Sequence, residues 1–189
     1  SSSFQNAVLA AGELEGVFPV DTKSLCTGMA LLVIKACEMR DAGRPAKEIA
    51  EQIALLREKV HTTFILNTLD YLSRGGRCSA VTAFGANLLS IKPSIEMVDG
   101  ALEVGKKYRG KIETVYNQYI RDQLSQPDKL DLSRAFLSHS GGVSEETLQA
   151  MKKEILKCAP FQEVQIIRAG CTISAHCGPK TATVMFMEK

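Results

Sequence analysis

The sequence predicts an α/β protein whose second part contains a mixed β-sheet. Up to about residue 60, the hydrophobic pattern indicates a helix, a short strand and two more helices, and beyond it strands and helices alternate. Asp99-Gly100 lies between two strand-like runs and predicts a hairpin, so at least one strand pair must be antiparallel. The chain has 189 residues, which is enough for one large domain or two small ones.

The first sixty residues predict a helix at 1–14, a strand at 17–21, a helix at 25–40 and a further helix that starts at Pro45. The helix at 25–40 is apolar almost all round, so we expect it to be buried on several sides or to line an apolar cavity. A lone strand cannot satisfy its backbone hydrogen bonds. The strand at 17–21 therefore either joins the later sheet or has its partners upstream of Ser1.

The rest of the sequence alternates between the two periodicities, with the polar stretch 126–131 as a connection. The expected elements are a strand at 61–67, a short helix from Thr68 to Gly75-Gly76, a helix from Ser79 with Phe84 and Leu88 inward, hairpin strands at 95–98 and 102–106, a helix at 111–124, a strand at 135–139, a helix capped by Ser144, and strands at 164–168 and 181–187.

Composition excludes several classes of protein. The net charge is only +2, which does not favour a nucleic-acid-binding protein. No apolar run is long enough to cross a bilayer and no signal peptide opens the sequence, so we expect no membrane insertion. The six cysteines form no C-x-x-C pair, and we expect them to be reduced, mostly buried side chains of a cytoplasmic protein without a bound metal.

Residues 170–179 are the first candidate site. Small residues and a Gly-Pro turn surround His176 between two expected strands, and an imidazole there can bind an anion, transfer a proton or ligate a metal. The alternative is an ordinary loop histidine. Cys177 next to it suggests a thiol nucleophile, but neighbouring side chains on an extended segment point in opposite directions.

Two further segments can bind anions. Ser1, Ser2 and Ser3 precede a helix, where hydroxyls and free backbone N–H groups attract negative charge, although a plain N-cap or a cloning remnant explains them equally well. The turn at 71–77 carries two arginines, and 106–111 is a basic cluster; both can also be ordinary solvated surface. No nucleophile elbow, phosphate-binding loop or metal motif is present.

Several segments, in this order, resemble the DegV family of bacterial fatty-acid-binding proteins. They are Ser-Ser-Ser-Phe-Gln-Asn-Ala at 1–7, Val-Asp-Thr-Lys-Ser at 20–24, Leu-Asn-Thr-Leu-Asp-Tyr-Leu at 66–72, Arg-Gly-Gly-Arg at 74–77, Leu-Leu-Ser-Ile-Lys-Pro at 88–93, Lys-Tyr-Arg-Gly at 107–110 and His-Cys-Gly-Pro at 176–179. The sequence departs from the family pattern at Ser2-Ser3, at Cys177 where threonine is common, and at Lys180 where glycine is usual. The last change is expected to place a cation beside the head-group site.

The resemblance implies a two-domain organisation in which the opening motifs of the family are missing. Residues 1–59 resemble the rear part of a parallel-sheet first domain. Residues 60–189 resemble the second domain, a two-layer α/β unit with a mixed sheet. The fold class that follows is a remnant of the first domain followed by the whole second domain.

The resemblance also implies a carrier and not an enzyme. Members of the family hold a long-chain fatty acid in an apolar tunnel and present its carboxylate to a fatty acid kinase, whose acyl phosphate product feeds phospholipid synthesis. By position, Ser1, Ser2 and His176 would bind the carboxylate, Arg77 and Arg109 would face the kinase, and no cofactor would be needed. The alternative from another class is a small hydrolase or transferase that uses His176 with a serine or with Cys177.

Overall fold

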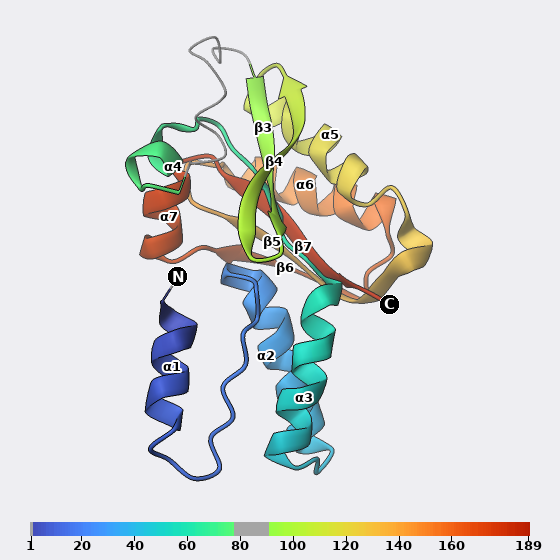
Figure 1. Ribbon diagram of the computed structural model, residues 1–189. Coiled ribbons are helices and arrows are strands. Elements are labelled where there is room, and N and C mark those ends of the chain that lie inside the picture. Colours follow the sequence, from blue (N-terminus) through green and yellow to red (C-terminus); the bar gives the residue numbers. More distant parts are fainter. Residues whose placement is uncertain (1, 78–90) are drawn as a thin grey trace.

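A computed structural model describes residues 2–77 and 91–189 as an α/β fold with one mixed sheet (Figure 1). The helices are α1 (Ser3–Ala11), α2 (Cys26–Asp41), α3 (Ala46–Leu56), α4 (Asp70–Arg74), α5 (Ile112–Gln123), α6 (Glu145–Cys158) and α7 (Cys171–Cys177). The strands are β1 (Val60–His61), β2 (Thr63–Ile65), β3 (Ile91–Val98), β4 (Ala101–Arg109), β5 (Leu130–His139), β6 (Glu163–Arg168) and β7 (Ala182–Glu188).

The sheet has the strand order β4-β3-β2-β7-β5-β6, and β1 also pairs with β7. β5 and β6 are parallel, because α6 provides the crossover between them, and the other pairs are antiparallel. The C-terminal strand β7 therefore lies in the middle of the sheet and is buried along all but its last residue. The predicted mixed sheet in the second part of the chain is confirmed.

Helices cover the two faces of the sheet differently (Figure 1). α5 and α6 pack on one face, where Tyr119, Ile155 and Phe186 belong to the largest buried cluster. On the opposite face, α2 packs against Phe136 and Met185, while α4 and α7 share a smaller cluster near β2. This second face is therefore covered by separate groups of helices, not by one continuous layer.

The local signals that rest on specific residue chemistry are confirmed. Asp99 and Gly100 both have positive φ, at 50° and 78°, as a two-residue hairpin turn of this hand requires. Ser144 caps α6 by accepting a hydrogen bond from the backbone N–H of Thr147 at 3.2 Å. The helix expected at 111–124 is α5, which buries five side chains on the sheet.

Three expected elements differ. Residues 17–20 belong to no strand, and Val17 and Phe18 are exposed. The expected strand at 61–67 is two short strands, β1 and β2, with Thr62 between them; the carbonyl oxygen of Thr62 accepts from Met97 N instead. The connection at 126–131 already enters β5 at Leu130. The helix expected from Ser79, with Phe84 and Leu88, lies outside the described residues.

α1 stands apart from the sheet in Figure 1, and none of its residues is buried. Its apolar side chains Phe4, Val8 and Leu9 are exposed, as is Phe18 in the segment that follows. Within residues 2–77 and 91–189, no helix combines the length and the apolar character needed to cross a membrane. A group of exposed apolar side chains such as this is typical of a surface that contacts another part of a protein or a partner.

Candidate functional site

A narrow apolar crevice lies on the second face of the sheet, between the start of α2 and α7. Its wall is formed by residues from β2, β5 and β7, from these two helices and from the segments next to them: Leu25, Cys26, Phe64, Ser138, His139, Ser140, Ala169, Ile173, Cys177, Thr181, Thr183 and Met185. The crevice volume is about 20 Å³, room for one or two water molecules. Its walls are thus almost in contact in this structure.

The hydroxyl groups along the crevice are already hydrogen-bonded within the protein. Ser138 Oγ bonds Thr27 Oγ1 at 2.7 Å, and Thr181 Oγ1 donates to the carbonyl oxygen of Cys177 at 2.9 Å. Ser140 Oγ donates to the carbonyl oxygen of Gly178. Because these oxygens are turned away from the cavity, a wall with several polar residues still presents an almost wholly apolar surface, which suits a hydrocarbon chain.

His176 lies on α7, one residue before its C-terminal end. The prediction of an extended segment here is wrong: residues 171–177 form two helical turns that start after Gly170. The reason is the spacing of Ile173 and Cys177, which are four residues apart and pack on one side of the helix against the cluster that contains Leu72. That spacing is the helical signal in the sequence that we missed.

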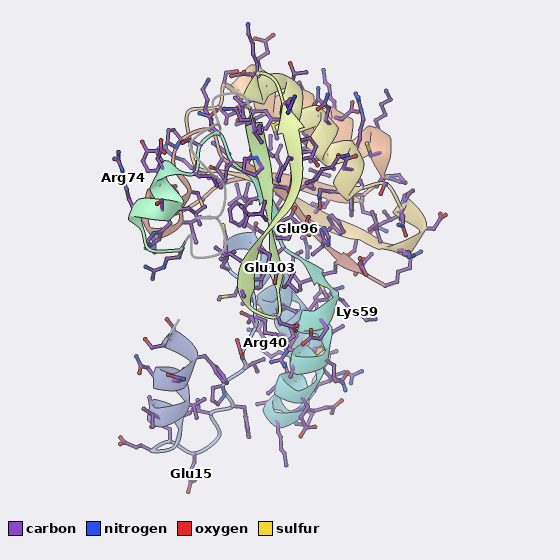
Figure 2. The ribbon with its side chains drawn as sticks, turned by 45° about the horizontal axis from the view of Figure 1, so that its top comes forward. Glu15, Arg40, Lys59, Arg74, Glu96 and Glu103 are labelled. Carbon is purple, nitrogen blue, oxygen red and sulfur yellow. The ribbon has the colours of Figure 1, made fainter. Side chains whose placement is uncertain are left out.

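The structure brings His176 and the Arg-Gly-Gly-Arg turn together. Gly75, at the C-terminal end of α4, lies so close to the imidazole that a Cβ built on it would overlap Nδ1. Arg77 belongs to the same turn: its Nη1 donates to the carbonyl oxygen of Gly75 at 2.6 Å, and its side chain is exposed. Arg74 extends from α4 away from the sheet (Figure 2). Two of the predicted site residues, His176 and Arg77, thus both contact Gly75, although 99 positions separate them in the sequence.

The other predicted site residues are placed separately. Ser1 lies outside the described residues, and Ser2 is an exposed N-cap of α1 without a side-chain capping bond. Arg109 ends β4 at the edge of the sheet and is exposed. Because Tyr108 packs with α5, alternation along the strand directs Arg109 to the opposite face, on which α4 packs. Arg109 and Arg77 therefore share a face of the sheet.

The side chain of Lys180 pairs with α5, whereas the sequence led us to expect this cation beside the histidine segment. Its Nζ pairs with Glu113 on α5 at 2.9 Å, on the face of the sheet opposite the crevice. Its backbone has a positive φ of 63° and its carbonyl oxygen accepts from the hydroxyl of Tyr116 at 2.7 Å. These bonds turn the side chain away from His176.

His139 is a crevice residue that the sequence analysis treated only as the end of a strand. Burial lowers its pKa, and the nearby charge of Arg168 lowers the pKa further. Its Nδ1 accepts a hydrogen bond from the backbone N–H of Gly141 at 3.2 Å, which fits a neutral imidazole. The available signal was its position at the carboxyl end of β5, just before Gly141-Gly142.

Cys177 is a poor nucleophile. It is buried, and burial raises the pKa of its thiol to about 11. We expect iodoacetamide at about pH 8 to alkylate Cys177 at least about tenfold more slowly than the exposed Cys171, because Cys177 is shielded from the reagent and its own thiol is mostly protonated. Peptide mass spectrometry over time measures the two rates, with unfolded protein as the control in which they become equal. Equal alkylation rates in the folded protein would make Cys177 a candidate nucleophile again.

A larger hollow, of about 510 Å³, lies beside α3 and is lined by Phe4, Val17, Phe18 and Pro19 among others. It is wide and open, and Lys47 and Glu51 stand at its rim. The narrow crevice is the better candidate for a lipid site, because it presents an almost wholly apolar surface and shares α7 with His176. In the parts of the chain that the structure describes, no group of three His, Cys, Asp or Glu side chains can hold a metal ion.

Comparison with known proteins assigns the chain to a family. Residues 1–189 match the family described as "Uncharacterised protein, DegV family". A DegV domain-containing protein of Clostridium acetobutylicum is 29% identical over 195 residues, and one of Clostridium perfringens is 30% identical over 197 residues. The match covers 100% and 99% of this chain but 66% of each relative, so the chain spans slightly less than two thirds of their length.

Solved structures share the fold. A DegV family protein from Thermus thermophilus, described by its fatty acid binding, superposes with a TM-score of 0.84 at 28% identity, over 100% of this chain and 67% of that one. The B3 protein of the Streptococcus pneumoniae fatty acid kinase, loaded with linoleic acid, gives a TM-score of 0.85 at 22% identity over 100% and 68%, a likeness of fold. Since the family match extends over every residue of the sequence, the chain belongs to the DegV family.

Proposed function

We propose that this chain binds a long-chain fatty acid, with the acyl chain in the crevice between α2 and α7 and the carboxylate beside His176. The observation that carries the proposal is that an apolar crevice and the candidate histidine share one short helix. Each methylene that leaves water contributes about 0.8 kcal/mol, so an apolar wall accounts for most of the affinity and a single polar end fixes the orientation. The Thermus relative, which binds a fatty acid, supports the same ligand class.

The chain acts as a carrier in this proposal and needs no cofactor. It presents the carboxylate to a partner fatty acid kinase, which forms the acyl phosphate used for phospholipid synthesis in the bacterial cytoplasm. The exposed Arg77 next to His176 and the exposed Arg109 on the same face of the sheet supply positive charge for that partner. The name of the pneumococcal B3 protein, which belongs to such a kinase, supports the partner.

We further propose the domain division suggested by the sequence: 1–59 as the rear part of a first domain and 60–189 as the second. Residues 60–189 contain every strand of the described sheet, with α5 and α6 as its helical layer. The uncovered side chains of α1 and of residues 17–18 support a first domain whose own sheet packs there in longer relatives. The crevice then lies between the two domains.

Lipid extraction from the purified protein tests the ligand. The chain, produced in a bacterial host and purified without detergent, is expected to release straight-chain fatty acids in a fixed molar ratio when denatured and analysed by mass spectrometry. His176→Ala is the matched variant and should release several-fold less, because the carboxylate loses its polar partner. Fatty acid at the level of an unrelated protein, both in this chain and in a longer relative, would refute the proposal.

A further inference from the structure

We infer that Gly75 is a positioning residue, which holds the imidazole of His176 in its place beside the crevice. The inference deepens the proposed function and rests on it for its consequence, but its geometry is independent of any ligand. It comes from the contact between α4 and α7, two short helices that lie far apart in the sequence and pack on each other in the structure (Figure 1).

The first step is steric. A Cβ on residue 75 would overlap Nδ1 of His176 and lie 3.0 Å from its Cε1 and 3.2 Å from the carbonyl oxygen of Tyr71. Gly75 itself has φ −76° and ψ −1°, a conformation open to any residue. The backbone therefore does not require glycine here. The absence of a side chain is needed chiefly for the imidazole, which makes the closest contact.

The second step is that α4 and α7 make a second close contact at a glycine. Gly178, directly after α7, faces the ring of Tyr71, and a Cβ on it would lie 2.7 Å from Cγ of that ring. α4 thus meets α7 through two residues without side chains, one on each side of the contact. Such close contact leaves little freedom for α7 to rotate, so the direction of the His176 side chain is fixed by α4.

The third step concerns the carbonyl group of the same glycine. Its carbonyl oxygen accepts from Arg77 Nη1 at 2.6 Å, and the backbone N–H of Arg77 bonds the carbonyl oxygen of Leu72 at 3.0 Å. Gly75 therefore contacts the imidazole through its Cα side and anchors the guanidinium through its carbonyl. A displacement at this residue is transmitted to both predicted site residues.

The experiment compares Gly75→Ala with Gly170→Ala in the full chain. Gly170 precedes α7, has φ −65°, and a Cβ on it would meet no atom within 4 Å, so it is a matched control. NMR of the ¹⁵N-labelled imidazole follows the chemical shifts of the two ring nitrogens of His176. We expect Gly75→Ala to change these shifts and Gly170→Ala to leave them unchanged. Unchanged His176 resonances in folded Gly75→Ala protein would overturn the inference.

Oleate binding supplies the functional readout. Gly75→Ala is expected to lower the affinity about tenfold, the loss of one good polar contact. In a His176→Ala background the same substitution should cost nothing more, because the group it displaces is gone. An equal loss in both backgrounds would show that Gly75 does not act through the imidazole. Absence of oleate binding by the unsubstituted chain would count against the proposed function only, since the NMR comparison still decides the positioning.

Discussion

Replacing Ala169 by leucine is expected to lower the affinity for oleate by about 10–100-fold. Ala169 lines the crevice at the end of β6 and is half-buried. A leucine side chain there adds three carbon atoms to a space of about 20 Å³. Those atoms occupy the path of two or three methylenes of the ligand, and each displaced methylene is worth about 0.8 kcal/mol.

Ala175→Leu provides the control for this substitution. Ala175 is on α7, one residue before His176, but it is exposed and does not line the crevice. The same three carbon atoms are therefore added to the same structural region without narrowing the cavity, and oleate binding should stay within about twofold of the original. Isothermal titration with oleate measures both variants, and thermal unfolding verifies that each is folded. Equal affinity in Ala169→Leu and Ala175→Leu would exclude this crevice as the acyl site.

The narrowness of the crevice makes the substitution informative. Its walls stand almost in contact, so α2 and α7 would have to separate at this point to admit the acyl chain of the proposed ligand. A leucine at 169 then acts in two ways, because it fills the cavity and adds contacts between the walls that must part. Both effects lower the affinity, and their sum explains why the expected loss extends to the upper end of the range.

The fold was predictable where a residue type dictates a conformation. Asp99-Gly100 predicts the hairpin because both positions need positive φ, and Ser144 predicts the start of α6 because its hydroxyl can accept from a backbone N–H. These signals are local and do not depend on the rest of the chain. The mixed sheet followed from the hairpin together with the alternation of strands and helices.

The remainder depended on contacts across the sequence. Residues 17–20 have the composition of a strand, but without paired neighbours in the described part of the chain they remain irregular. Lys180 is turned away from the candidate site by Glu113, which lies 67 positions earlier. Neither outcome has a signal within the local sequence. The family resemblance named His176 and Arg77 for separate roles, whereas their common contact with Gly75 required the structure.

The exposed apolar side chains of α2 allow a further test of the proposed division into residues 1–59 and 60–189. The sequence predicts burial on several sides, and the structure packs α2 against the sheet and against α3 but leaves a further side exposed. Leu31 and Leu32 pack on Phe136, Met185 and neighbouring side chains of the sheet, whereas Met29 and Val33, four residues apart on another side, are exposed. The two sides of one helix should therefore respond very differently to the loss of an apolar side chain.

Leu32→Ala is expected to lower the free energy of unfolding by about 2–4 kcal/mol, because Leu32 is 1% exposed and its removal leaves a cavity against the sheet. Val33→Ala, at a residue that is 54% exposed, should change it by less than about 0.5 kcal/mol, and alanine's better helix propensity favours the stabilising direction. Urea unfolding followed by circular dichroism measures both. A loss at Val33 comparable with that at Leu32 would mean that this side of α2 is already covered in solution, by a second copy of the chain, and the dependence of unfolding on protein concentration would identify that case. A large loss at Leu32 with almost no change at Val33 would instead mean that this side of α2 is uncovered in solution. It would then be available to pack against the sheet of the proposed first domain.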